Sequence, residues 1–146
     1  MASGKFAMAV HALVLLAQSE EGYPSEYIAG SVNTHAVFLR RVLRRLAEAG
    51  LIEAREGRGG GYRLARPAAR LTLAEVYRVM EPEGPLTPSP CDPNEKCPVG
   101  AGMRAAFATA AAVARNGLEA ALAGQTVADV ARTALRRGKA VPAAAT

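Results

Sequence analysis

Aromatic side chains are scarce in this chain of 146 residues: they make up 5% of it, and Trp is absent. Half of the residues are nevertheless hydrophobic. The core must therefore be built mainly from Ala, Leu and Val, and this favours close-packed helices. A chain of this length fits one compact domain, or one small domain with an appendage.

Long apolar runs are also absent. The longest, residues 7–17, contains His11 and reaches about half of the roughly 20 residues that a membrane span needs. Residues 1–6 carry one Lys, and no cleavage pattern of a secretory signal follows them. We therefore expect a cytoplasmic protein without a membrane partner, in which residues 7–17 form a buried helix.

Motifs of the common enzyme classes are missing. The sequence contains no Cys-x-x-Cys redox pair, no phosphate-binding glycine loop before a helix, no nucleophile elbow and no metalloprotease motif. We therefore expect no catalytic residues. The net charge of +5 permits attraction to nucleic acid or to an anionic membrane surface, and charge alone does not choose between them.

Apolar residues at helical spacing predict three helices in the first part of the chain. Their expected ranges are 5–18, 25–31 and 35–49. Ser25 is placed to cap the second helix, and Asn33 and Thr34 offer caps for the third. Gly50 is expected to end the third helix. The apolar face of that helix consists of Leu39, Val42, Leu43 and Leu46.

A hairpin is predicted directly after these helices. Two short extended runs, residues 52–55 and 62–65, are joined by a loop that is mostly glycine. Thr72 and Glu75 then resemble a capping box that opens a fourth helix. The order of elements predicts a mainly α domain with a small β-hairpin over residues 1–80.

The composition changes after this domain. Residues 81–98 hold six of the nine prolines, so no regular element is expected there. Residues 99–123 are almost all apolar or Ala and predict a long helix that is apolar on most of its circumference. A second copy of the chain would cover such a helix in a symmetric dimer.

One more helix is expected over residues 126–137, starting at Thr126 and Asp129. We group residues 99–137 as a helical dimerisation region, and we expect residues 138–146 to form a flexible tail.

The third helix and the hairpin together predict a winged helix-turn-helix, in which the second helix of the motif enters the major groove of DNA. Residues at the N-terminal end of that helix reach base edges, and cations along it neutralise phosphates. The candidates for reading bases are Thr34, His35, Val37, Arg40 and Arg41. Arg44 and Arg45, further along, are expected to contact phosphates. Four arginines on a helix often form only a solvent-exposed face. The basic hairpin directly after this helix favours DNA binding instead, because a merely solvent-exposed face does not require such a hairpin.

The hairpin adds cations near its tip. Arg58 lies between glycines, where a flexible loop can place the guanidinium in a minor groove or on a phosphate. Gly59 and Gly60 permit close approach to the sugar-phosphate backbone. Arg55 and Arg63 flank the loop. The expected partner of these residues is double-stranded DNA.

Several segments carry a resemblance to a known family: Phe6-Ala7-Met8-Ala9-Val10-His11-Ala12-Leu13, Ala49-Gly50-Leu51-Ile52, Gly59-Gly60-Gly61-Tyr62, Leu64-Ala65 and Leu71-Thr72-Leu73. On these motifs the chain is similar, over residues 5 to about 135, to the Rrf2 family of bacterial transcription regulators. The resemblance implies a homodimer with one winged helix-turn-helix per subunit and long helices at the dimer interface, usually acting as a repressor.

The wing departs from the family pattern. Relatives commonly have Arg-Gly-Pro before the glycines, whereas here Glu56 and Arg58 take the first and last of those positions. A carboxylate near DNA is unfavourable, so we expect Arg58 to replace the lost cation.

Several members of the family hold an iron-sulfur cluster with three cysteines in the loop before the long helix. Here Cys91 and Cys97 are followed six positions later by Met103, and a thioether is a poor ligand for such a cluster. Some relatives recruit a His and an acidic residue from the first helix of the partner subunit. His11 is suitably placed, but the position four before it is Ala7. The set is incomplete, so we expect no cofactor and no metal.

Three interpretations of the cysteines stay open. A disulfide between Cys91 and Cys97 would make a thiol switch that reshapes the proline-rich loop. A metal or an iron-sulfur cluster would use both thiols with His11, although such a His is more often a satisfied core residue. In the third interpretation neither thiol senses anything.

The leading hypothesis for function is a transcription regulator, acting as a repressor, that binds a near-palindromic operator as a homodimer. The alternative is a regulator that responds to redox state, a metal or an iron-sulfur cluster through Cys91 and Cys97.

Overall fold

The computed structural model describes residues 4–139, and its elements follow the predicted order. The elements are α1 (Lys5–Leu16), α2 (Ser25–Val32), α3 (Ala36–Glu48), β1 (Ile52–Arg55), β2 (Gly61–Leu64), the short 3₁₀ helix η1 (Ala68–Arg70), α4 (Leu73–Met80), α5 (Pro98–Ala123) and α6 (Val127–Gly138). The two strands form one antiparallel hairpin. The predicted fold class, mainly α with a small β-hairpin, is confirmed.

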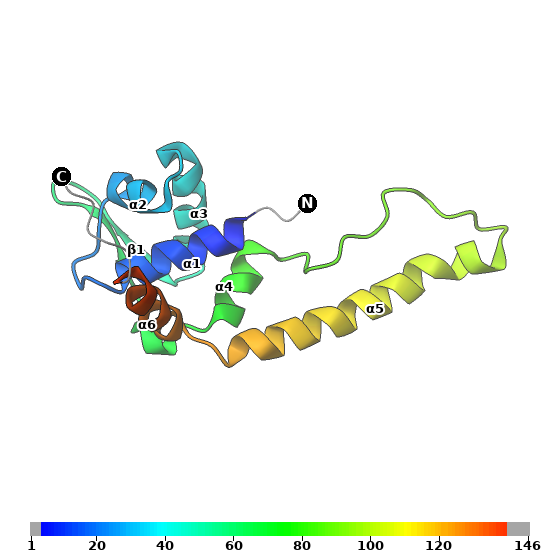
Figure 1. The fold of residues 1–146 in the computed structure, drawn as a ribbon. Coiled ribbons are helices and arrows are strands. Elements are labelled where there is room, and N and C mark those ends of the chain that lie inside the picture. The colour runs from blue at the N-terminus through cyan, green and yellow to red at the C-terminus, as the bar shows by residue number, and fades with distance from the viewer. Residues whose placement is uncertain (1–3, 140–146) are drawn as a thin grey trace.

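The core surrounds α1, which contacts α2, α3, α4 and α6 (Figure 1). Ala9 and Ala12 of α1 are fully buried, and their small side chains allow the neighbouring helices to approach closely. The predicted apolar face of α3 is confirmed, because its buried residues are Leu39, Val42, Leu43 and Leu46. Phe6 adds an edge-to-face contact with Tyr77, with ring centroids 5.4 Å apart.

The C-terminal helix α6 packs back onto this core. The backbone N–H of Leu73 donates to the carbonyl of Gln125 at 2.9 Å, and that of Val127 donates to the carbonyl of Leu71 at 2.8 Å. Val127 is fully buried, and α6 contacts α1 and η1. Gly138, expected in the flexible tail, is instead the last residue of α6. The rest of that predicted tail lies outside the described residues, apart from Lys139.

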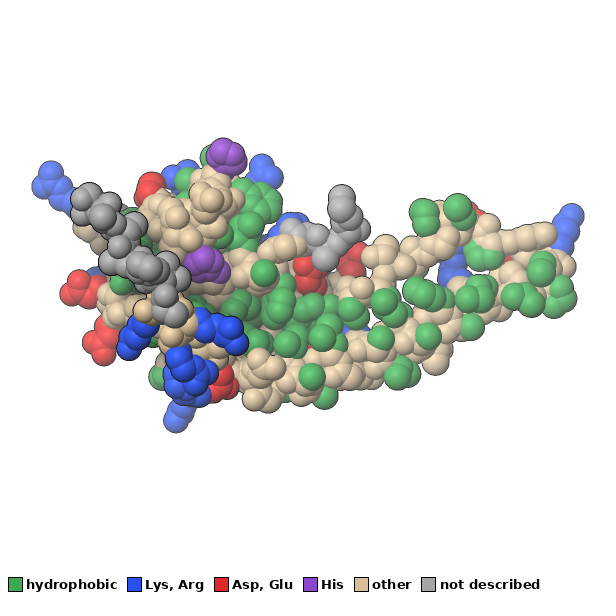
Figure 2. All heavy atoms as spheres, viewed as in Figure 1, with side chains coloured by type: hydrophobic (Ala, Val, Ile, Leu, Met, Phe, Trp, Pro, Cys, Tyr) green, Lys and Arg blue, Asp and Glu red, His purple; other side chains and the backbone are tan. Residues whose placement is uncertain are grey.

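Residues 81–123 form an arm that extends away from the core (Figure 1). Residues 81–97 contain no helix or strand, as their prolines predict. The remainder of the arm is α5, which runs for 26 residues, all of them described and none of them buried. Hydrophobic side chains are therefore exposed along the arm (Figure 2). Over residues 4–139, none of the helices combines the length and apolar character that a bilayer crossing demands.

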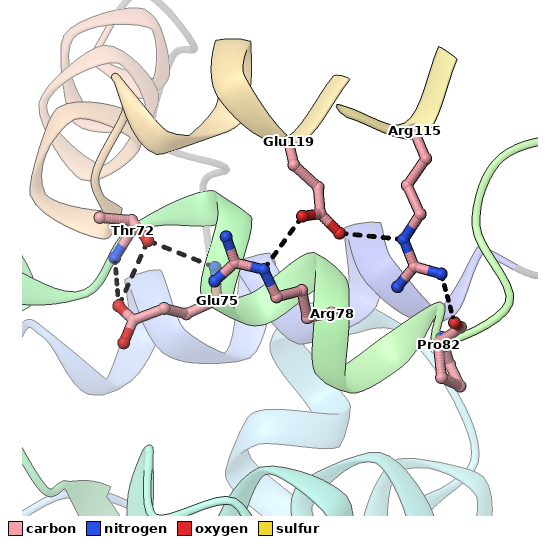
Figure 3. Close-up of polar contacts among 6 residues, drawn as sticks. All are labelled: Thr72, Glu75, Arg78, Pro82, Arg115 and Glu119. Atoms are coloured by element: carbon pink, nitrogen blue, oxygen red, sulfur yellow. Dashed lines mark hydrogen bonds and ion pairs between the residues drawn. The ribbon is translucent and has the colours of Figure 1, made fainter. Parts of the chain in front are cut away.

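Two predicted helix ends are confirmed. Thr72 and Glu75 form the capping box of α4, in which Thr72 Oγ1 accepts from the backbone N–H of Glu75 at 3.2 Å (Figure 3). Gly50 follows α3 with φ +77°, a left-handed conformation that glycine adopts without strain.

The predicted caps of α2 and α3 are wrong. Ser25 is the first residue of α2, and the cap position before it is occupied by Pro24, where no side-chain cap bond forms. Its hydroxyl instead accepts a hydrogen bond from Arg40 of α3. Asn33 ends α2 in the left-handed conformation, so the residue before α3 is His35. Asparagine tolerates that conformation better than other residues with a side chain, which suits it to a turn.

Candidate nucleic-acid interface

A tight turn connects α2 and α3. The backbone N–H groups of Asn33 and Thr34 both donate to the carbonyl of Ala29, at 2.8 and 3.1 Å. His35 follows as the N-cap residue of α3, and its side chain makes no capping bond. The first N–H groups of α3 are therefore not capped by that side chain, and free N–H groups at a helix N-terminus attract phosphate.

α3 contacts the core through its buried face and exposes a basic face. Its exposed residues include Val37, Arg40, Arg41, Arg44 and Arg45. Arg44 pairs with Glu48 at 3.0 Å within the helix. Arg41 and Arg45 have no ionic partner among the described residues, so their guanidinium groups are available to an outside anion.

Arg40 differs from the other arginines because it reaches across to α2. Its Nη2 donates to Glu26 Oε1 at 3.0 Å, and its Nε donates to Ser25 Oγ at 3.3 Å. The pKa of Glu26 lies below its ordinary value because of a backbone hydrogen bond and because of Arg40. Glu26 is therefore ionised near neutral pH, and the structure brings a carboxylate next to a predicted base-reading residue.

The wing is a hairpin whose tip requires glycine. Arg55 lies opposite Gly61 in the antiparallel pair, so β2 begins one residue earlier than predicted. Gly57 and Gly59 have φ values of +89° and +76°, which favour glycine. A Cβ at Gly60 would lie 2.3 Å from the carbonyl oxygen of Arg55, so a side chain there would collide with the returning strand.

The wing is also attached to the segment just before α2, a contact that the sequence pattern does not predict. Tyr23 and Tyr62 exchange backbone hydrogen bonds of 3.0 and 2.9 Å, which form an isolated antiparallel β-bridge. Gly22 has φ +80°, and a Cβ there would lie 1.8 Å from the carbonyl oxygen of Tyr62. The glycine before Tyr23 was the available signal, because a residue that must approach another backbone closely is often glycine.

The cations of the wing divide into paired and unpaired groups. Arg63 is held by Glu53 at 2.8 Å. Arg55 and Arg58 are exposed and have no ion pair among the described residues. Glu56 is exposed beside them, so Arg55 and Arg58 are the wing residues best placed to meet an anion.

The root of the arm is fixed by a small polar network around Glu119 of α5 (Figure 3). Its carboxylate accepts from Arg115 Nε at 3.1 Å and from Arg78 Nε, on α4, at 3.2 Å. Arg115 also donates through Nη1 to the carbonyl of Pro82 at 2.7 Å. These hydrogen bonds lower the pKa of Glu119 below its ordinary value, with that from Arg115 contributing most. The network joins α4, α5 and the beginning of the proline-rich segment.

Both cysteines lie on the arm as free, exposed thiols. Cys97 occupies the N-cap position of α5. Hydrogen bonds from the backbone N–H groups of Gly100 and Val99 lower the pKa of Cys97 below its ordinary value. Cys97 therefore ionises more readily than an ordinary cysteine thiol. Cys91 lies six positions before it in the irregular segment.

The metal candidates do not come together within one chain. His11 is exposed on α1, where its Nε2 lies 3.0 Å from Ser31 Oγ, so the expectation of a core histidine is wrong. Between residues 4 and 139, no group of three or more His, Cys, Asp or Glu side chains could hold a metal ion. Two thiols and the thioether of Met103 do not fit a cluster. An iron site therefore has no complete ligand set in the described part of a single chain.

Comparisons with known proteins give consistent results. The Rrf2 family, described as iron-dependent transcriptional regulators, matches residues 2–133. The HTH-type transcriptional regulator YwnA of Bacillus subtilis is 34% identical over 130 residues, which cover 89% of this chain and 96% of YwnA. A solved structure of a protein described as DNA-binding is 31% identical with a TM-score of 0.69, covering 86% of this chain and 97% of that one.

The fold is also shared with more distant regulators. CymR, the global cysteine regulator of B. subtilis, has a TM-score of 0.63 at 23% identity, covering 91% of this chain and 97% of CymR. The relatives named here are regulators rather than enzymes, in agreement with the absence of enzyme motifs. Because the family matches nearly the whole sequence, the chain belongs to the Rrf2 family of DNA-binding transcriptional regulators.

Proposed function

We propose that the protein is a sequence-specific repressor that binds a near-palindromic operator in double-stranded DNA as a homodimer. The observation that carries the proposal is an exposed, arginine-bearing α3 beside a glycine-tipped wing that is bonded to the segment just before α2. A unit of this kind contacts a major groove and the adjacent minor groove together. Because a regulator acts where the chromosome is, we place the protein in the cytoplasm.

The N-terminal half of α3 is proposed to read bases. Arg41 is exposed and unpaired within the described residues, and Arg pairs with guanine through two hydrogen bonds. Val37 is 63% exposed on the same helix, where an apolar side chain can contact the methyl group of thymine. Thr34 and His35 lie at the start of α3 and can reach base edges or phosphates. Arg40 belongs to the same set.

Phosphate contacts are proposed for the cations further from the start of α3. Arg44 and Arg45 lie on the next turn, and Arg55 and Arg58 lie on the wing. Gly59 and Gly60 have no side chain that would keep the wing backbone away from the sugar-phosphate chain. These contacts supply affinity that depends on salt rather than on sequence.

The arm is proposed to form the dimer. Val99, Met103 and Val113 of α5 are 72%, 48% and 68% exposed, and no other part of the described chain buries this helix. Packing α5 against the same helix of a second copy would cover these side chains with one self-complementary interface. The two-fold symmetry of that dimer is the reason to expect a near-palindromic operator.

Selection of bound DNA tests this function. Random double-stranded fragments are incubated with the purified protein, and the bound fraction is sequenced over successive rounds. We expect inverted repeats with half-site centres about 10 base pairs, or a small multiple, apart. Bound fragments without a shared sequence contradict the proposal. A reporter gene behind the selected operator should be transcribed less when the protein is present, and increased transcription contradicts the repressor role.

A second candidate function is regulation through the thiols of the arm. It is favoured by the exposure of both cysteines and by the lowered pKa of Cys97, since the thiolate is the reactive form. Oxidation by a peroxide would join Cys91 and Cys97 in a disulfide, as two thiols lose two protons and two electrons and the peroxide is reduced to water.

The thiol hypothesis is tested by comparing operator affinity before and after treatment with hydrogen peroxide, with Cys91→Ser as the control. A disulfide found by mass spectrometry, with a change in affinity that the control lacks, supports it; unchanged affinity contradicts it. Anaerobic purification tests the iron-sulfur alternative, for which bound iron and visible absorbance are required.

A further inference from the structure

One edge of the Arg40 guanidinium is held inside the protein. Nε donates to Ser25 Oγ at 3.3 Å, and Nη2 donates to Glu26 Oε1 at 3.0 Å. Nε and Nη2 lie on the same edge of the planar group, so both bonds fix its orientation as well as its position. Ser25 is 8% exposed and is the one buried polar residue found over residues 4–139. The Arg40 bond gives its hydroxyl a partner.

The opposite edge of the same guanidinium remains open. The N–H groups on Nη1 and the second N–H of Nη2 have no partner in the described part of the chain. The Arg40 side chain is 49% exposed, so this edge is accessible from outside. Two parallel N–H donors at the end of an arginine match the O6 and N7 acceptors of guanine.

We propose that Glu26 and Ser25 are positioning residues that present the free edge of Arg40 to a guanine of the operator. The inference deepens the proposed function and rests on it. A long side chain normally loses rotamer freedom when it binds a base. The hydrogen bonds from α2 already restrict the Arg40 rotamer in the free protein, so less side-chain entropy is lost when Arg40 binds a base.

Glu26 lies in the first turn of α2, where a carboxylate favours the helix N-terminus, but that place does not by itself require the bond to Arg40. An exposed ion pair contributes little to the stability of a folded protein, and Glu26 and Arg40 are both exposed. A carboxylate beside a DNA-binding helix also repels phosphates, which weakens binding to any sequence. A positioning role accounts for both facts, because the ion pair lowers binding to DNA in general and raises preference for one base.

The Arg44–Glu48 pair offers a matched control. It is also an exposed pair with a separation of 3.0 Å, but both residues lie within α3 and further from its N-terminus. Glu48→Ala removes one carboxylate, as Glu26→Ala does, without touching Arg40. The two variants therefore differ in positioning and not in net charge.

The test measures dissociation constants of Arg40→Ala, Glu26→Ala, Glu26→Gln and Glu48→Ala, with Tm for each protein. The DNA is the operator selected with the wild-type protein and a series with each guanine replaced. We expect Arg40→Ala to lose about fivefold or more of the preference for one guanine. Glu26→Ala should lose most of that same preference, while binding DNA without the guanine as tightly as the wild type or more tightly.

Glu26→Gln should retain part of the preference, because its amide oxygen still accepts from Nη2, and Glu48→Ala should retain all of it. The inference is overturned if Glu26→Ala leaves the guanine preference unchanged, or weakens binding to every DNA alike. A wild-type protein that selects no sequence overturns the proposed function and this inference with it. A wild-type protein that selects an operator, with an unchanged preference in Glu26→Ala, overturns the inference alone.

Discussion

Glu119 of α5 accepts a hydrogen bond from Arg78 of α4 at 3.2 Å, across 41 positions of the chain. The same carboxylate accepts from Arg115, which also holds the carbonyl of Pro82 (Figure 3). Arg115 thus links the start of the arm at Pro82 to Glu119 near its end. Because α5 is proposed to pair the two subunits, a firmly held root of the arm would fix the distance between the two DNA-binding units of such a dimer.

Glu119→Gln should therefore lower the affinity for the full operator and have little effect on the stability of the folded protein. The amide keeps the shape of the carboxylate but loses its charge, so Arg78 and Arg115 are held less firmly and the arm gains freedom at its root. We expect lower affinity for the operator, and little change in affinity for a single half-site, in gel-shift titrations. Equal losses on both DNAs would place the effect in the DNA-binding unit and contradict this role for Glu119.

The wing should depend on Gly22. Gly22→Ala places a Cβ 1.8 Å from the carbonyl oxygen of Tyr62 and requires an alanine at φ +80°, so the Tyr23–Tyr62 bonds must break or shift. We expect a lower Tm and weaker binding to all DNA sequences. Gly30→Ala is the control, because a Cβ there meets nothing within 4 Å. Gly30 lies inside α2, so its replacement should raise stability by up to about 1 kcal/mol.

The fold could be predicted where the signal is local. The apolar spacing of Leu39, Val42 and Leu43 identified the buried face of α3, and Thr72 with Glu75 identified the start of α4. The pairing of Tyr23 with Tyr62 joins residues far apart in the chain, and no local pattern encodes it. The return of α6 to the core rests on similarly distant backbone bonds.

The sequence predicts which residues belong to the candidate site but not how their side chains pair. Arginines on α3 and the wing are visible in the sequence. Their pairing is not, because it depends on how α2 crosses α3. Ser25 shows the difference: its position favours a helix cap, whereas the fold places its hydroxyl against Arg40.

The capping box of α4 should make stability sensitive to acid. Burial raises the pKa of Glu75, but hydrogen bonds from Thr72 and Arg66 outweigh burial and leave that pKa below its ordinary value of 4.5. A depressed pKa adds stability above the ordinary value, and that stability is lost as the pH falls through the lowered pKa. Urea unfolding should show Glu75→Gln less stable than the wild type at pH 7, with the difference shrinking below about pH 4.5. A difference independent of pH contradicts this assignment.

Thr72→Ala removes the other half of the same box. Loss of a capping hydroxyl costs about 1 kcal/mol in the free energy of unfolding. Thr109→Ala is a suitable control, since Thr109 is exposed within α5 and bonds only the carbonyl of Ala105. An unfolding free energy unchanged by Thr72→Ala would show that the box contributes nothing in solution.

The dimer should depend on the exposed side chains of α5. Val113→Glu places a charge where the second copy is proposed to pack, and sedimentation should then detect monomers. Leu135→Glu makes the same kind of change on α6, where Leu135 is 49% exposed, and should leave the dimer intact. Circular dichroism should be unchanged in both, because neither residue is buried. A Val113→Glu protein that remains dimeric contradicts the proposed interface.

The most direct test of sequence reading by α3 is the ratio of operator affinity to random-DNA affinity, measured for the wild type and Arg41→Ala. Arg137→Ala, in the last turn of α6, is the matched control and should leave the ratio unchanged. If Arg41 reads a base, its replacement lowers operator affinity by about fivefold or more, and random-DNA affinity by less. An equal loss on both DNAs would contradict base reading by α3.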